Sequence, residues 1–203
     1  MNRSLRLTSL LKKLKNFTSF IILSMNRIEN FTLLIKLDVS GYLSLTLLPN
    51  ELNNITSLIK LAMKRYSRLI SLPKELGNLT FLIILNIRNL ILISKELDNL
   101  TSLTTLDVKE FLNLTSLPKE LSNLLSLIKL HMKRYLSLIK LPKEFNNIIF
   151  LTKLHMKGCS CLISLPKELG NLTSLTKLCM RGYSSLTSLL KELANFTFLY
   201  LLF

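Results

Sequence analysis

Two histidines and one cysteine, His131, His155 and Cys179, recur at the same interval, each within a Lys-Leu-x-Met segment. Imidazole nitrogens and thiolate sulfurs are ligands that Zn²⁺ takes in tetrahedral sites. A lysine or an arginine lies two positions to either side of each of the three, which opposes a bound cation, and no fourth ligand stands out. We therefore expect no metal at this position and no cofactor elsewhere.

No set of side chains with catalytic spacing stands out. The chain has only these two histidines. It shows no nucleophile–base pair, no pair of carboxylates and no glycine-rich loop that could cradle a phosphate. We expect a protein that is not an enzyme.

Asparagine begins an Asn-x-Thr triplet, the acceptor for glycans in secreted proteins, at many positions. Seven triplets share one phase of a repeat, and Asn113 is out of phase: Asn16, Asn30, Asn54, Asn78, Asn99, Asn171 and Asn195. Lys12, Lys13 and Lys15 interrupt any apolar stretch of a secretory signal near the amino terminus. The triplet is therefore best explained as part of the repeat, and a glycosylated receptor fragment is the alternative.

A repeat runs through the sequence, marked by the stretch Leu-Pro-Lys-Glu-Leu. Its last residue falls at Leu52, Leu76, Leu97, Leu121, Phe145, Leu169 and Leu193, with one step of 21 and five of 24. All five prolines share one position of the repeat, and all five internal methionines share another. In segments such as Leu154-His-Met156, apolar and polar residues alternate, which predicts a short strand with one buried face. Stacked copies would form a parallel sheet over one continuous core.

This pattern resembles that of leucine-rich-repeat proteins, and the resemblance covers essentially the whole chain. It implies an α/β-type solenoid, a horseshoe with a parallel β-sheet on its concave side. We expect about eight to nine repeats of about 24 residues, a period in the range of such repeats. Little helix is expected, because Pro-Lys-Glu-Leu-x-Asn-Leu is too short for more than one or two turns.

Two details resemble the repeats of cytosolic plant disease-resistance receptors of the nucleotide-binding leucine-rich-repeat class. These are the spacing Cys-x-x-Leu or Tyr-x-x-Leu after the strand and the stretch Leu-Thr-Ser-Leu-Pro, and the passage GCSCLISLPKELGNLTSLTKL from Gly158 is the nearest match. The resemblance implies recognition of another protein domain. No phosphate-binding motif G-x-x-x-x-G-K-[ST] is present, so this chain lacks the nucleotide switch of that class.

The position three places after the methionine, here called the ladder position, is unusual. Such repeats normally place a buried Asn or Cys there to bond the backbone of the turn, whereas this chain has Tyr42, Tyr66, Phe111, Tyr135, Cys159 and Tyr183. Phe cannot make that bond, and a Tyr hydroxyl lies too far from its own backbone. The rings could pack as an aromatic column, and the sequence leaves open whether they point inward or outward.

We expect residues 1–203 to form a single repeat array without recognisable caps, with degenerate repeats at 1–30 and 77–97. Uncapped ends leave apolar strand edges exposed, so we expect the two ends to be the least stable parts and to permit end-to-end self-association. A fragment of a longer array, a decayed copy without selected function, and a subunit that needs a partner at its end all fit these features.

The net charge of +15, from 27 basic and 12 acidic residues, is predicted to gather on the concave face. Strand alternation places 14 bases and three acids there, a net +11, with Arg27 as the first base and Asp38, Asp107 and Glu110 as the acids. The predicted partner-binding residues are Lys36, Lys60, Lys64, Arg65, Arg88, Lys109, Lys129, Lys133, Arg134, Lys153, Lys157, Lys177 and Arg181. An acidic protein is the expected partner, and nucleic acid is not expected because we predict no aromatic residue at any concave position. Duplication of a basic repeat unit would explain the same charge without a ligand.

The three cysteines are odd in number and lie in the last third of the chain, which fits a reducing compartment. No apolar run approaches the length of about 18 to 20 residues that a membrane-spanning helix needs. Together these features predict a cytoplasmic, non-catalytic protein-binding module, which could serve as the recognition part of a defence or signalling receptor of plant type.

Overall fold

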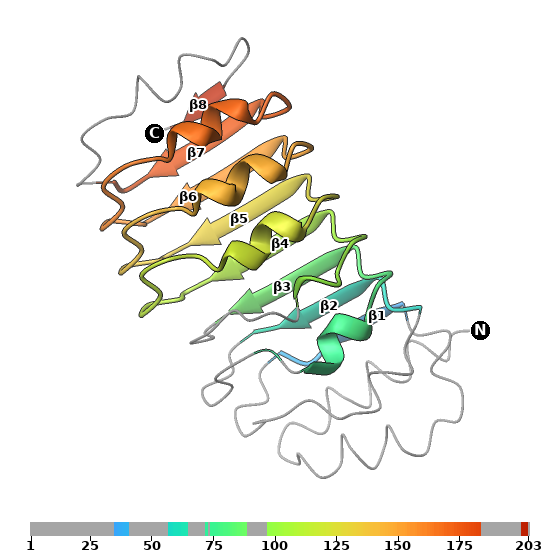
Figure 1. Cartoon of the computed structure of the whole chain (residues 1–203). Coiled ribbons are helices and arrows are strands. Elements are labelled where there is room, and N and C mark those ends of the chain that lie inside the picture. Colours follow the sequence, from blue (N-terminus) through green and yellow to red (C-terminus); the bar gives the residue numbers. More distant parts are fainter. Residues whose placement is uncertain are drawn as a thin grey trace.

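A parallel sheet runs through the computed structural model, which describes residues 35–40, 57–64, 72, 74–88, 97–183 and 200–202. Within these ranges, eight strands follow one another in chain order without a crossover (Figure 1). Their bounds are β1 Lys36–Asp38, β2 Lys60–Met63, β3 Ile84–Arg88, β4 Thr105–Lys109, β5 Lys129–Lys133, β6 Lys153–Lys157, β7 Lys177–Arg181 and β8 Tyr200–Leu202. This confirms the predicted solenoid with a parallel sheet.

The strand register reproduces the repeat position by position. Lys129 pairs with Lys153 and Lys153 with Lys177 at the full repeat spacing. Ile84 pairs with Thr105 across the shorter unit. The shorter unit at 77–97 therefore loses its residues outside the strands, and the sheet continues through it without a shift.

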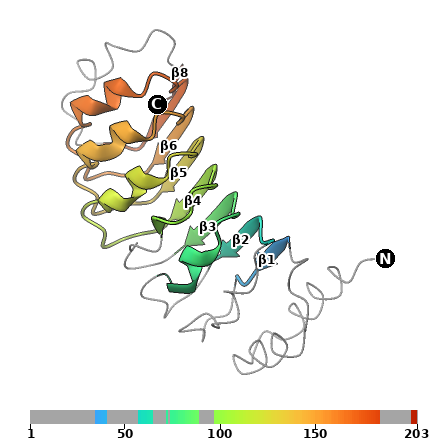
Figure 2. The ribbon, with the colours of Figure 1, turned by 45° about the vertical axis from the view of Figure 1, so that its right-hand side comes forward.

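In the part of the chain that the structure describes, four short 3-10 helices lie on the other side of the sheet and form a second layer (Figure 2). They are η3 Lys74–Asn78, η5 Lys119–Asn123, η6 Lys143–Asn147 and η7 Lys167–Asn171, and each contains five residues. A proline with φ near −66° precedes η5 and η6, which suits the fixed ring geometry of proline. The small helical content confirms the prediction.

Alternate strand residues point into the core between the two layers. Leu130, Leu154 and Leu178 are completely buried, and Met132, Met156 and Met180 are at most 3 % exposed. The same alternation turns the residues between them to the concave face. This confirms the predicted assignment of the two faces of the strands.

The ladder residues point inward, which settles the orientation that the sequence left open. Phe111, Tyr135 and Cys159 are fully buried, and Tyr183 packs against the core. The rings of Phe111 and Tyr135 are stacked, with centroids 5.2 Å apart and an interplanar angle of 8°. The Tyr135 hydroxyl is buried without a hydrogen-bond partner, so the ring fills the ladder position by packing alone. Tyr42 and Tyr66 lie outside the described residues.

The expected degenerate repeat at 1–30 lies outside the described residues, as do the residues around the ends apart from Tyr200–Leu202. End-to-end self-association and the lower stability of the ends therefore stay predictions. Among the residues that the structure places, no helix has the length and apolar character needed to cross a membrane.

Candidate functional site

The predicted basic residues occupy two rows that run across the concave face of the sheet. The first row lies at the start of the strands and contains Lys36, Lys60, Lys129, Lys153 and Lys177; the last row lies at their ends and contains Lys64, Arg88, Lys109, Lys133, Lys157 and Arg181. Arg134 follows the last row directly, and Arg65 lies outside the described residues. The sheet thus brings twelve of the thirteen predicted residues onto one face.

On β5, β6 and β7, exposure differs between the first and the last residue of each strand. Lys133, Lys157 and Arg181 are exposed, whereas Lys129, Lys153 and Lys177 are only half-exposed. Lys129, Lys153 and Lys177 were expected to stand exposed in one row, and the structure leaves them only partly exposed.

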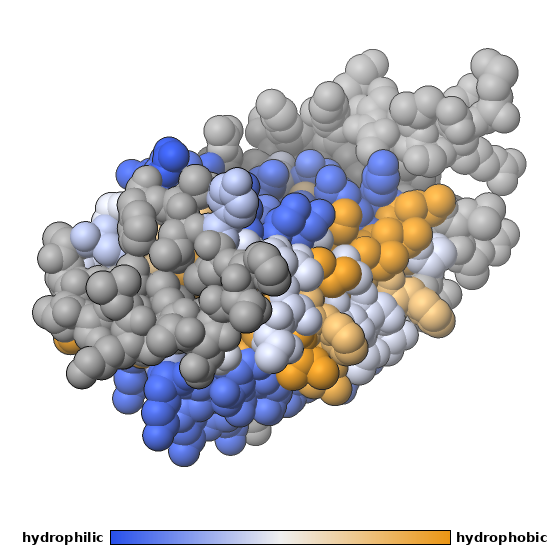
Figure 3. Space-filling model, turned by 90° about the horizontal axis from the view of Figure 1, so that it is seen from above, coloured by the Kyte–Doolittle hydropathy of each residue, from blue (hydrophilic) through white to orange (hydrophobic). Residues whose placement is uncertain are grey.

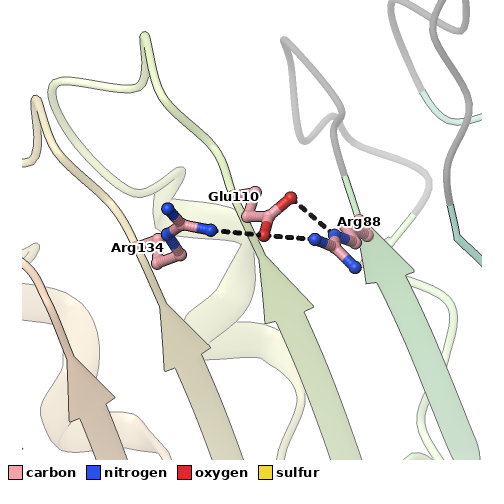
Figure 4. Close-up of polar contacts among 3 residues, drawn as sticks. All are labelled: Arg88, Glu110 and Arg134. Atoms are coloured by element: carbon pink, nitrogen blue, oxygen red, sulfur yellow. Dashed lines mark hydrogen bonds and ion pairs between the residues drawn. The ribbon is translucent and has the colours of Figure 1, made fainter.

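Glu110 neutralises part of the last row at the middle of the sheet (Figure 4). Arg88 donates two hydrogen bonds to it, one from Nε to Oε2 at 2.5 Å and one from Nη2 to Oε1. Arg134 donates a third from Nη1 to Oε1 at 3.2 Å. The hydrogen bonds from Arg88 lower the pKa of Glu110 against the opposing effect of burial, and the same contact raises the pKa of Arg88.

A second ion pair lies beside it on β4. Lys109 donates from Nζ to Oδ2 of Asp107 at 2.7 Å. The sequence predicted that Arg88, Lys109 and Arg134 are available for a ligand, and the structure shows all three engaged with acidic side chains. The presence of Asp107 and Glu110 in one repeat was a sequence signal that acidic groups lie near these bases, although it did not specify which base each acid contacts.

The uncompensated charge is therefore concentrated on β5, β6 and β7. These strands have the sequences KLHMK, KLHMK and KLCMR, which contain no acidic residue. Six bases face the concave side here, namely Lys129, Lys133, Lys153, Lys157, Lys177 and Arg181. Neighbouring strands are about 4.8 Å apart and a strand rises about 3.3 Å per residue, so the two rows lie roughly 13 Å from each other.

The floor between the two rows is formed by His131, His155 and Cys179. The two imidazole rings are stacked, with centroids 4.6 Å apart and an interplanar angle of 8°. Burial lowers the pKa of both rings, and the nearby lysines lower it further. Stacked rings do not converge their nitrogens on one point, and within the described ranges no group of three His, Cys, Asp or Glu residues could hold a metal. Cys159 is buried, Cys161 is exposed, and both, like Cys179, are free thiols.

One exposed aromatic residue on this face was missed in the sequence. Tyr200 of β8 pairs with Lys177 in the first row and is 78 % exposed. The prediction that no concave position is aromatic is therefore wrong. The last strand begins slightly earlier than the repeat spacing predicts, so the spacing did not assign Tyr200 to a concave position. Among the described residues, this single ring beside the bases differs from the series of aromatics on which single-stranded nucleic acid stacks.

Solved structures of leucine-rich-repeat proteins resemble this chain, although no family model and no curated protein matches the sequence. The leucine-rich repeat domain of the type III effector XopL superposes with a TM-score of 0.65 at 24 % identity, covering 83 % of this chain and 68 % of that one. A leucine-rich repeat protein of Leptospira interrogans gives 0.57 at 26 % identity, covering 94 % of this chain and 59 % of that one. The sheet topology, the repeat register and these likenesses together identify the fold of this chain as a leucine-rich-repeat solenoid.

Proposed function

We propose that the chain is a non-catalytic protein-binding module whose concave face binds an acidic surface of another protein. The observation that carries the proposal is the set of six bases on β5, β6 and β7 that face no acidic residue of their own strands. The sequence passage from Gly158 that resembles plant resistance receptors supports a role as the recognition part of a defence or signalling receptor. Residues 1–203 would form one array acting in the cytoplasm.

The physical basis is mutual repulsion within the two rows. Strands about 4.8 Å apart hold like charges closer than the Debye length of about 8 Å at physiological salt. An acidic partner would relieve this repulsion, and its encounter with the concave face would be accelerated by the long-range field. The convex side carries a Lys-Glu pair in each of η5, η6 and η7, so it offers no comparable field.

The test replaces four concave lysines, Lys129, Lys133, Lys153 and Lys157, by Gln. The matched control replaces four exposed convex lysines, Lys74, Lys119, Lys143 and Lys167, by Gln, which removes the same total charge. Binding of a fluorescent glutamate-rich peptide is followed by anisotropy at low and at physiological salt. We expect the concave variant to lose binding and the control to retain it, with weaker binding at higher salt. An equal loss of peptide binding in both variants would show that binding depends only on net charge, and it would refute the proposed site.

A secreted, glycosylated receptor fragment is the second candidate, and one observation favours it. The asparagines of four Asn-x-Thr triplets, Asn78, Asn99, Asn113 and Asn171, are exposed, as glycan attachment requires. Expression in the native host followed by enzymatic removal of N-glycans decides between the two. A shift in electrophoretic mobility would support the secreted receptor fragment, whereas an unchanged mobility would favour the cytoplasmic binding module.

A further inference from the structure

The segment that leads from each 3-10 helix into the next strand differs between repeats at its exposed positions. Repeats leading into β4 and β7 have the same sequence, Asn-Leu-Thr-Ser-Leu-Thr, at 99–104 and 171–176. The segments leading into β5 and β6 are Asn-Leu-Leu-Ser-Leu-Ile at 123–128 and Asn-Ile-Ile-Phe-Leu-Thr at 147–152. Apolar residues thus replace Thr or Ser in these two repeats, as they do at the exposed Phe81 and Ile83 of the segment Asn-Leu-Thr-Phe-Leu-Ile at 78–83 that leads into β3.

These replacements contribute little to the core. In the same two segments, Leu124, Leu127, Ile148 and Leu151 are the residues that are fully buried. The replaced positions point outward: Leu125 is 56 % exposed, Ile149 is 50 % exposed and Phe150 is 58 % exposed. Their counterparts Thr101 and Thr173 are exposed as well, so the repeat folds equally well with polar residues here.

We call the four exposed residues Leu125, Ile128, Ile149 and Phe150 the apolar flank. Figure 3 shows hydrophobic residues gathered along the side of the molecule at which the strands begin, between hydrophilic faces on either side. On the concave side the apolar flank adjoins the first basic row, since Lys129 follows Ile128 directly. The carbonyl of Ile128 also accepts hydrogen bonds from the backbone N–H groups of Thr152, at 2.9 Å, and Lys153, at 3.1 Å.

We propose that the apolar flank and the adjoining Lys129 and Lys153 together bind an acidic peptide segment of a partner protein. The segment crosses the rim of the sheet, with apolar side chains on the flank and carboxylates on the first basic row. This inference rests on the proposed acidic partner and adds the kind of segment that is recognised and the place where it enters.

The arrangement favours a protein segment over other partners that suit apolar and basic residues. A flat anionic membrane that touched the flank could not follow the surface onto the concave face, where the lysines lie. A second copy of this chain would bring another net charge of +15 against the same bases. A peptide is narrow enough to contact both surfaces at once.

The test restores the polar residues of the neighbouring repeats by the triple substitution Leu125→Thr, Ile149→Thr and Phe150→Ser. The control is a triple substitution on the opposite flank, Leu136→Ser, Ile139→Thr and Ile163→Thr, which also removes three exposed apolar side chains. Two synthetic peptides of equal length carry the same number of glutamates, and one has a terminal Leu-Phe-Leu where the other has Ser-Ser-Ser. Thermal unfolding of each variant checks that the fold is retained.

We expect the native chain to bind the Leu-Phe-Leu peptide about tenfold more tightly than its serine counterpart, because apolar surface is removed from water. The flank variant should lose this tenfold preference, and the opposite-flank control should keep it. Equal binding of both peptides, with loss only in the concave lysine variant, would overturn the inference and leave the proposed function standing. Absence of binding to either peptide would overturn both. Flank-dependent binding to phosphatidylserine vesicles without the peptide preference would overturn the inference by assigning the flank to a membrane.

Discussion

Individual side chains on the concave rim are held in an unusual backbone conformation. Glu110 and Arg134 have φ values of 60° and 61°, and the equivalent residues of the next two repeats are Gly158 and Gly182, with φ values of 69° and 76°. A residue with a Cβ atom is disfavoured in this region relative to glycine. The strain at Glu110 and Arg134 is therefore maintained by the surrounding strands, and it places Glu110 where it can form ion pairs with both Arg88 and Arg134. Glycine at three copies of this position, Gly41, Gly158 and Gly182, was visible in the sequence, but the conformation of Glu110 and Arg134 was not.

At the ladder position, we expect Tyr135→Phe to leave stability unchanged or raise it by about 1 kcal/mol, since the buried hydroxyl has no partner and its desolvation is uncompensated. The stacked contact with Phe111 would be retained. The reverse substitution Phe111→Tyr is the control and should destabilise the fold, because it buries a new hydroxyl. Urea unfolding measures both. A clear loss of stability in Tyr135→Phe would reveal a hydrogen bond of the hydroxyl.

The stacked histidines predict how stability depends on pH. Burial lowers the pKa of His131 and His155 in the folded state, so the unfolded chain binds more protons once the pH falls below the ordinary histidine value of about 6.5. Stability should therefore be fully present above that pH and decrease on acidification, until the lowered folded-state pKa is passed. Lys129 and Lys153, which flank the rings, add to the effect, and Asp107 beside His131 opposes it. Replacing both histidines by Gln should make the free energy of unfolding less dependent on pH between about 7.5 and 5.5, a range that brackets the ordinary histidine pKa of about 6.5. Urea unfolding at several pH values measures this. An unchanged slope would contradict a lowered pKa of these two half-buried rings.

At the scale of the elements, alternation and spacing were sufficient to predict the strands and their faces. Leu154 and Met156 point inward because strand side chains alternate, and Pro118, Pro142 and Pro166 each directly precede a short 3-10 helix. The sequence could not show that Glu110 reaches Arg88, because that contact depends on side-chain directions at the ends of two neighbouring strands. It also could not orient the ring of Tyr135, because both directions satisfied the same pattern.

A core substitution in the middle of the sheet tests the stacking of repeats. Leu154 is fully buried in β6 and pairs in register with Leu130 and Leu178. We expect Leu154→Ala to lower the free energy of unfolding by roughly 2 to 5 kcal/mol, the usual range for a buried leucine. Ile163→Ala, at a position that is 50 % exposed, is the control and should stay within about 0.5 kcal/mol. Similar losses in the two variants, measured by urea unfolding, would argue against the core described here.

At the scale of the whole molecule, charge is divided unevenly between the two layers. The described concave face has twelve bases and three acids, and those acids lie on or next to β1 and β4. The convex helices alternate Lys with Glu, so their charges offset one another. Repulsion is consequently greatest within β5, β6 and β7, which are also the strands that carry the candidate binding surface.

This uneven distribution of charge predicts that salt stabilises the unliganded protein by screening repulsion on its concave face. Added salt shortens the Debye length to about 3 Å at 1 M, which is less than the spacing of neighbouring strands, so the repulsion between Lys129, Lys153 and Lys177 should be screened. The midpoint of thermal unfolding should therefore rise with sodium chloride. The variant with Gln at the four concave lysines should start from a higher midpoint and respond less to salt, whereas the variant with Gln at the four convex lysines should respond as the native chain does. Parallel salt dependences in all three proteins would show that the repulsion is spread over the whole surface, and the concave charge would then be a consequence of duplicated repeats with no effect of its own.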